Sequence, residues 1–126
     1  MSELRCVRVP RHTLPERALT RVDVAGRQVV VALRDDKVFA FADRCPHRGA
    51  PLSCGGELVR PFVPSGGRLE PSATDSHVRC PWHKWDFDLA SGRCTTDGRL
   101  RVRIYHAWFE RDEVVVSLDP RVKAAA

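Results

Sequence analysis

The sequence predicts an all-β fold, because strand-like alternation and turn residues recur along the chain and no stretch of helical period reaches helical length. Apolar and polar residues alternate with a period of two, which is the pattern of a half-buried strand. Short pairs containing Gly or Asp separate these segments, as turns require. We therefore expect a small antiparallel sandwich or barrel.

Three strands are expected in the first third of the chain. Residues 19–24 alternate, the Ala-Gly pair at 25–26 offers a turn, and residues 28–33 form a run rich in β-branched side chains. The Asp-Asp pair at 35–36 makes the next turn before a strand at 37–42. This order predicts an antiparallel meander.

Two further strands are expected towards the C-terminus. Residues 99–104 alternate without a fault, which puts arginines on the wet face and aliphatic side chains inside. The pair at 112–113 turns the chain into a closing strand at 114–118. We expect one domain over residues 1–119 and a frayed tail at 120–126.

The middle of the chain, about residues 43–98, has a different character. It holds four of the five cysteines and most of the Gly and Pro residues. Within it, residues 55–76 are rich in Pro, Gly and Ser, which predicts an irregular insertion. Long loops in compact domains are usually functional or disordered.

Composition narrows the function classes. The 126 residues, 43% hydrophobic and 29% charged, suit one globular domain. The net charge of +5 is spread along the chain without a dense basic block, so we expect no nucleic-acid partner. No apolar run is long enough to span a bilayer and residues 1–10 do not form a signal peptide, so we expect a cytoplasmic protein with no membrane partner. An odd number of cysteines in that compartment favours metal binding over disulfides.

Two short cysteine–histidine pairs are the strongest chemical signal. Cys45 and His47 are one residue apart, Cys80 and His83 are two residues apart, and 32 residues separate the pairs. Each pair combines a soft thiolate with an imidazole. If the two loops approach each other, the cysteines can meet at one metal and the histidines at a second.

The residues around these pairs favour rigid loops. Pro46 and Pro81 follow the two cysteines and fix the local backbone. Gly49, Gly55 and Gly56 permit backbone shapes that a side chain would block.

Two segments, CPHRGAPL at 45–52 and CPWHKWDFDLASGR at 80–93, resemble the Rieske family. The resemblance covers most of the chain and implies a Rieske-type antiparallel β-sandwich or barrel with a two-loop cluster-binding subdomain. It also implies one [2Fe–2S] cluster in which His₂ replaces Cys₂ on one iron. The implied ligands are Cys45 and Cys80 on the shielded iron and His47 and His83 on the exposed one.

The residues that are missing indicate the branch of the family. Ala50 and Trp82 stand where members in cytochrome complexes carry a loop disulfide. Trp85 and Phe87 stand where those members place a serine and a tyrosine hydroxyl against the cluster sulfurs. Because hydrogen bonds to the sulfurs raise the potential, we expect a low-potential, ferredoxin-like centre.

The resemblance implies a one-electron carrier without catalytic activity of its own. Its donor and acceptor would be redox proteins, in a system such as a ring-hydroxylating oxygenase or a nitrite-reductase-like enzyme. Lys84 replaces the glycine usual in the family, and Arg44 and Arg48 flank the first loop. A basic tip of this kind predicts an acidic docking patch on the partner and electron transfer that slows with salt.

The main alternative is a zinc-stabilised Cys₂His₂ binding module without redox activity, because the same ligands suit tetrahedral zinc. A Cys–His nucleophile would leave the second pair unexplained. Three cysteines are expected to be ordinary small residues, three histidines to lie at the surface or at strand edges, and three aromatic residues to pack around the cluster. In that order they are Cys6, Cys54 and Cys94; His12, His77 and His106; and Trp82, Trp85 and Phe87.

Overall fold

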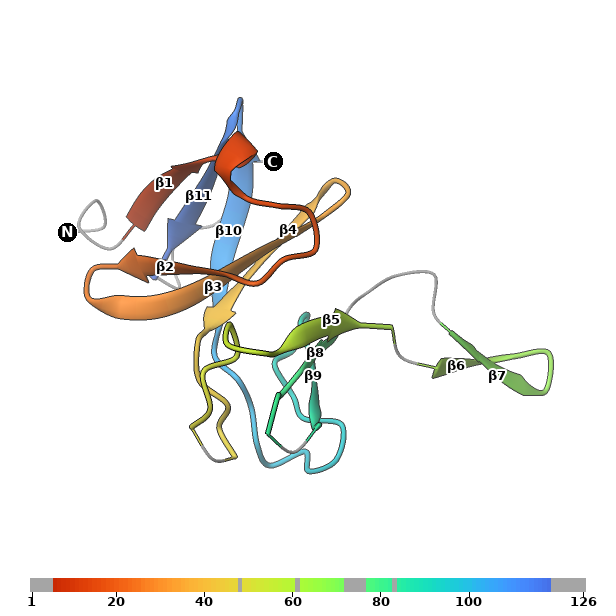
Figure 1. Ribbon diagram of the computed structural model, residues 1–126. Helices are drawn as coiled ribbons and strands as arrows, with labels where there is room; N and C mark the ends of the chain where they lie inside the picture. Colours follow the sequence, from red (N-terminus) through yellow and green to blue (C-terminus); the bar gives the residue numbers. More distant parts are fainter. Residues whose placement is uncertain (1–5, 48, 61, 72–76, 83, 119–126) are drawn as a thin grey trace.

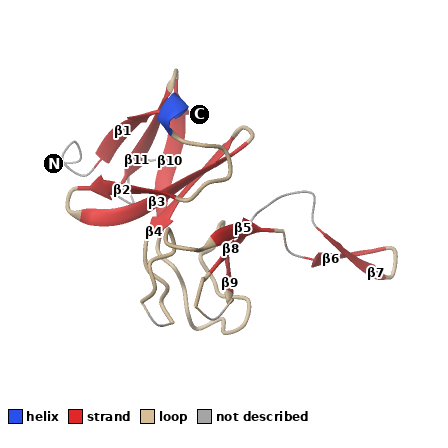
Figure 2. Ribbon diagram, viewed as in Figure 1, coloured by secondary structure: helices blue, strands red, loops and turns tan. Residues whose placement is uncertain are grey.

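The computed structural model describes residues 6–47, 49–60, 62–71, 77–82 and 84–118. They form eleven strands and one turn of 3-10 helix, Arg11–Thr13, so the predicted all-β class is confirmed (Figure 2). No helix in these ranges is long and apolar enough to cross a membrane.

The frame of the molecule is a six-stranded antiparallel sheet with the order β1-β11-β10-β4-β3-β2 (Figure 1). Its strands are β1 (Cys6–Pro10), β2 (Thr20–Val24), β3 (Arg27–Arg34), β4 (Lys37–Ala42), β10 (Ile104–Glu110) and β11 (Glu113–Ser117). Side chains from β1 and β2, at the two ends of this order, pack in the same buried cluster. The sheet therefore curls towards closure.

The meander predicted for the first third of the chain is β2–β3–β4. Both residues of the first turn, Ala25 and Gly26, have positive φ angles of 50° and 84°. Turns of this hand match the twist of the strands that they join. The predicted meander is confirmed, because two-residue turns and β-branched side chains set the backbone conformation of their own short segments.

The strand predicted at 99–104 is wrong for most of its length. The continuous ladder begins at Ile104 and runs to Glu110, and Arg101 forms only an isolated bridge to Arg93. The amide of Val102 donates instead to the carbonyl oxygen of Gly92 at 2.8 Å. Alternation alone could not reveal that a loop, rather than a strand, lies beside this segment.

Two buried clusters lie on opposite faces of the sheet. Along β3, Val29 and Val31 belong to one cluster while Val30 belongs to the other. The second cluster also contains Cys45 and Cys80. Side chains on the face with Val29 and Val31 therefore pack inside the curled sheet. Side chains on the face with Val30 pack against the predicted cluster-binding region.

That region contains a second, three-stranded sheet with the order β5-β8-β9. Its strands are β5 (Glu57–Val59), β8 (His77–Arg79) and β9 (Asp86–Asp88). A separate hairpin, β6 (Phe62–Ser65) and β7 (Arg68–Pro71), projects away from the rest of the molecule (Figure 1).

The insertion predicted as irregular at 55–76 thus contains β5 and a regular hairpin, which corrects the prediction. Prolines and glycines hid the pairing, since prolines in strands are tolerated where the strand has a free edge. Residue 61 and residues 72–76 of the insertion lie outside the described ranges, as does the tail at 120–126.

Candidate metal centre

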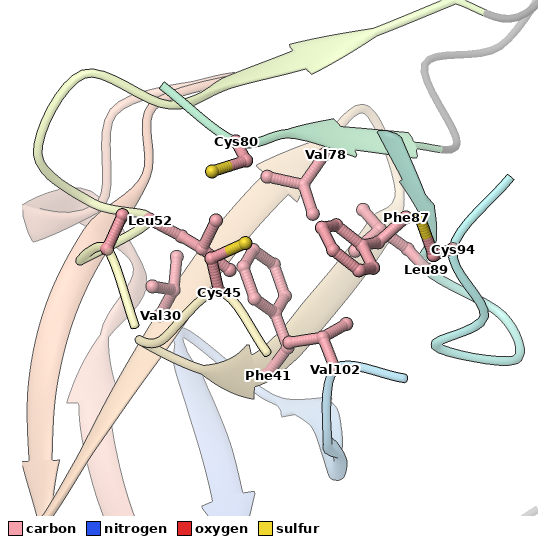
Figure 3. Close-up of a cluster of buried hydrophobic side chains, with 11 residues drawn as sticks. Val30, Phe41, Cys45, Leu52, Val78, Cys80, Phe87, Leu89, Cys94 and Val102 are labelled. Atoms are coloured by element: carbon pink, nitrogen blue, oxygen red, sulfur yellow. The ribbon is translucent and has the colours of Figure 1, made fainter. Parts of the chain in front are cut away.

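The two predicted cysteine ligands lie in loops that leave different sheets. Cys45 follows β4 of the large sheet, and Cys80 follows β8 of the small one. Both are fully buried and share one apolar cluster with Phe41, Leu52 and Val78 (Figure 3). The structure therefore brings together two thiols that are 35 positions apart in the sequence.

The first ligand loop is closed by two backbone hydrogen bonds at its cysteine. The amide of Cys45 donates to the carbonyl oxygen of Ala50 at 2.8 Å. The amide of Gly49 donates to the carbonyl oxygen of Cys45 at 2.6 Å. Gly49 has a φ of 79°, so a left-handed residue makes the corner of this loop.

The second ligand loop repeats this pattern at the same offsets. The amide of Cys80 donates to the carbonyl oxygen of Trp85 at 2.8 Å, and the amide of Lys84 donates to the carbonyl oxygen of Cys80 at 3.1 Å. Lys84 has a φ of 59° and takes the corner that Gly49 takes in the first loop. The two loops are therefore backbone counterparts, which was not predicted from the sequence.

Gly56 fills a tight place between the two loops. A Cβ atom there would collide with the carbonyl oxygen of Leu52 and would lie 3.0 Å from that of Arg79, the residue before Cys80. Gly55, with a φ of 98°, lies against the ring of Pro81. The predicted need for glycine at these positions is confirmed, and its cause is contact between the loops.

A buried carboxylate closes the base of the first loop. Asp43 accepts hydrogen bonds from the Ser53 amide at 2.7 Å, from the Ser53 hydroxyl at 2.5 Å and from Arg21 Nε at 2.6 Å. Burial raises the pKa of Asp43, but the hydrogen bonds from Ser53 and Arg21 outweigh this effect and hold the pKa below its usual value. The charged carboxylate thus joins both ends of the loop to β2.

This set of three residues was not predicted from the sequence. A signal was present, because Asp43 follows the apolar strand β4 and stands two residues before Cys45. Its partner Arg21 comes from another strand, and only the tertiary structure pairs them.

The imidazole of His47 stacks on an aromatic ring of the other loop. Its centroid lies 4.0 Å from that of Trp85, with 24° between the ring planes. Asp97 lies in the loop after β9, and its pKa is lowered chiefly by hydrogen bonds from Arg99 and to a smaller extent by His47. The two cysteine–histidine loops therefore contact each other through the stacked rings of His47 and Trp85.

The aromatic frame was predicted only in part. Phe87 is fully buried and Trp85 is partly buried against the same apolar cluster. The prediction for Trp82 is wrong, since 59% of this residue is exposed. It follows Pro81 on the outer side of the second loop, where no buried cluster reaches it.

The fourth predicted ligand, His83, and the flanking Arg48 lie outside the described residues. Within the part of the chain that is described, no three Cys, His, Asp or Glu side chains gather at one point as a metal-binding group. A two-iron cluster takes two protein ligands on each iron, so it does not require three side chains at one point. Buried thiols with a partly exposed imidazole beside them suit a cluster whose thiolate iron lies deepest.

The remaining cysteines and histidines fall mainly as predicted. None of the five cysteines, all of which are described, forms a disulfide bond; Cys54 is exposed, Cys6 is partly buried and Cys94 is buried in the apolar cluster. His12 is exposed and His106 is partly buried. His77 was expected at a surface or strand edge but is 9% exposed, because β8 is the central strand of its sheet.

Comparison with protein families gives one match across most of the chain. The model of the Rieske [2Fe-2S] domain matches residues 5–106, which include both cysteine–histidine pairs.

Solved structures with a similar fold include a carrier and an enzyme subunit. The ferredoxin of carbazole 1,9a-dioxygenase from Nocardioides aromaticivorans IC177 has a TM-score of 0.70 at 26% identity, covering 91% of this chain and 99% of that chain. A proposed NADH-dependent nitrite reductase small subunit from Mycobacterium tuberculosis has a TM-score of 0.66 at 26% identity, covering 94% and 98%.

Curated relatives are much longer than this chain. The methylxanthine N3-demethylase NdmB of Pseudomonas putida is 36% identical over 73 residues, which are 58% of this chain and 17% of that protein. The oxidoreductase NdmD of the same organism is 30% identical over 84 residues, or 65% of this chain and 11% of that protein. This chain thus spans less than a fifth of either relative.

Proposed function

Since this chain belongs to the Rieske [2Fe-2S] domain family, we propose that it is a one-electron carrier of the ferredoxin type rather than an enzyme. Its cluster would be held by two cysteine–histidine pairs, Cys45/His47 and Cys80/His83. The main support is the matched pair of loops, which places two fully buried thiols in one cluster of apolar side chains.

The protein's own residues would exclude water and keep the ligands in place. When bound, the cluster accepts and returns one electron. Phe41, Leu52 and Phe87 pack in the same apolar cluster as the two cysteines and would shield them from water. Trp85 supports the ring of His47 by stacking, and Asp43 holds the ends of the first loop. The small rearrangement that such a rigid site allows favours rapid electron transfer.

We place the centre at the low-potential end of the Rieske range, which runs from about −150 to +300 mV. Trp85 and Phe87 carry no hydroxyl group that could donate to a cluster sulfur, and Phe87 is fully buried. A redox titration should therefore give a midpoint below zero. A midpoint well above zero would contradict this assignment.

The donor and acceptor would be redox proteins of an oxygenase or nitrite-reductase-like system, as the similar structures suggest. A cytoplasmic setting agrees with five cysteines that form no disulfide bond, because that compartment keeps thiols reduced. Neither a nucleic acid nor a membrane is part of the proposed role.

The deciding experiment is an EPR spectrum of anaerobic, dithionite-reduced protein, with iron, sulfide and zinc measured in the same sample. We expect a red-brown protein with a rhombic signal whose average g lies below that of a free electron. Cys80→Ser should abolish the signal, whereas Cys54→Ser should retain it. A colourless, EPR-silent protein that contains zinc would instead support a structural Cys₂His₂ site.

A further inference from the structure

Lys84 occupies a backbone position that a lysine adopts at a cost. Its φ of 59° lies in the left-handed region, and its counterpart in the first loop is a glycine, Gly49. Three of the other non-glycine residues with positive φ, Ala25, Asp35 and Arg111, lie in tight turns between paired strands. A strained residue in a ligand loop suggests a functional role for its side chain.

What the side chain of Lys84 adds to the corner is a positive charge. Glycine would satisfy the same backbone without strain. The lysine is exposed, so its charge faces solvent beside the second ligand loop.

The first loop also has a positive charge at this corner, but there the charge belongs to a neighbouring residue, Arg44. The Arg44 guanidinium lies over Gly49, with its Nε 3.4 Å and its Nη2 3.6 Å from the position that a Cβ atom would take. Arg44 is also exposed. Each ligand loop thus has one cation at its left-handed corner.

These two cations are not neutralised by the acidic residues around them. Three described carboxylates of this region already hold other arginines: Asp43 binds Arg21, Asp86 binds Arg79, and Asp97 binds Arg99. A fourth, Glu57, interacts electrostatically with Arg79. Within the described ranges, neither Arg44 nor Lys84 forms an ion pair with a carboxylate. The outer end of the two loops therefore keeps a net positive charge.

We propose that Arg44 and Lys84 form a matched pair of cations at the electron exit, which attracts an anionic electron-transfer partner, namely an acidic protein surface. The inference rests on the proposed function, because the exit is defined by the cluster ligands. Exposed Trp82, in the same loop as Lys84, supplies an apolar contact beside the charges. An apolar centre within a charged rim is typical of protein interfaces.

Small oxidants of opposite charge test this surface without knowledge of the natural partner. The reduced, cluster-loaded protein gives one electron to ferricyanide, an anion, or to tris(phenanthroline)cobalt(III), a cation. Second-order rates are measured by stopped flow over a range of ionic strength. The variants are Lys84→Asn, since Asn tolerates the left-handed conformation, and Arg44→Gln.

A matched control is Lys37→Asn, which removes the same charge at the opposite end of β4 from the first loop. The six residues of β4 place Lys37 about 17 Å from the end of the strand at which the first loop begins. This distance exceeds the Debye length of about 10 Å at 0.1 M salt. At low ionic strength, Lys84→Asn should slow ferricyanide by roughly three- to fivefold and accelerate the cobalt complex. The control should change each rate by less than half as much.

Opposite effects on the two oxidants distinguish local charge from a change in driving force, which would move both rates in the same direction. Rates in Lys84→Asn that match those in Lys37→Asn would overturn the inference and leave the carrier function intact. Absence of the rhombic EPR signal from reduced wild-type protein would overturn the proposed function itself. Thermal unfolding of Lys84→Asn and Lys84→Gly should occur at or above the wild-type temperature, because both substitutions relieve the strained corner.

Discussion

At the scale of single residues, the geometry of the two cysteine–histidine loops depends on a few positions outside the proposed ligand set. Asp43 is the clearest of these, since its side chain is fully buried and accepts hydrogen bonds from both Ser53 and Arg21. A buried carboxylate is stable only when its oxygens are satisfied in this way. The geometry of the first loop is therefore tied to β2.

Asp43→Asn should lower the free energy of unfolding by about 1–3 kcal/mol, because the amide removes the charge that Arg21 and Ser53 satisfy. Chemical denaturation measures the change. Asp36→Asn, in the exposed turn between β3 and β4, is the control with the same change of charge. Equal stability of the two variants would show that the carboxylate does not hold the loop.

Gly56→Ala should also destabilise the protein, by about 1–3 kcal/mol, because its Cβ atom would collide with the carbonyl oxygen of Leu52. The variant should lose its cluster more readily to a chelator, which is followed by the fading of the visible absorption. In Gly98→Ala, the new Cβ atom meets only the flexible side chain of Arg93 at 3.6 Å, so little change is expected there.

At the scale of secondary-structure elements, the β6–β7 hairpin is amphipathic. The register pairs Phe62 with Pro71 and Pro64 with Leu69, and residues paired across strands share a face. Phe62 is 66% exposed and Leu69 is 69% exposed, and neither belongs to a buried cluster. The described side chains of the hairpin therefore add nothing to the two buried clusters.

The double variant Phe62→Ser/Leu69→Ser should change the free energy of unfolding by no more than about 0.5 kcal/mol. Its EPR signal should match that of the wild type. Arg68→Ser/Glu70→Ser, on the other face of the hairpin, is the matched control. A large drop in unfolding temperature confined to the apolar pair would mean that this face packs on the body of the protein.

At the scale of the whole molecule, two apolar cores divide the structure into regions that we expect to depend differently on the proposed iron–sulfur cluster. The cluster that contains Cys45 and Cys80 joins β4 to the small sheet. The cluster inside the six-stranded sheet contains no cysteine and takes side chains such as Val24, Val114 and Val116. Removal of the iron–sulfur cluster should therefore loosen the core around Cys45 and Cys80 and leave the core inside the six-stranded sheet unchanged.

Hydrogen exchange of cluster-loaded and cluster-free protein tests this division. Amides of β5, β8 and β9 should lose protection from exchange when the iron–sulfur cluster is removed, because two cysteine side chains in their core would no longer be held by iron. Amides of β10 and β11 should change little. Equal loss in both regions would show that the two cores unfold as one unit.

The sequence predicted the parts of the fold that local rules govern. Strand alternation and two-residue turns placed β2, β3 and β4, and the arginines at 101 and 103 were correctly assigned to the exposed face. The strand at 99–104 and the irregular insertion were wrong, because pairing partners far along the chain decided whether these segments joined a ladder.

The sequence by itself determined the family and led to the proposed donor set, because ligand type, proline and glycine act over a few neighbouring residues. Only the tertiary structure decided that Asp43 meets Arg21, that His47 stacks on Trp85, and that Trp82 faces solvent. These contacts join segments distant in the chain, so they depend on how the two sheets pack. The pair of cations, Arg44 and Lys84, depends on both the sequence and the tertiary structure. The sequence supplies the two charges, and the folded backbone places them at equivalent corners of the two loops.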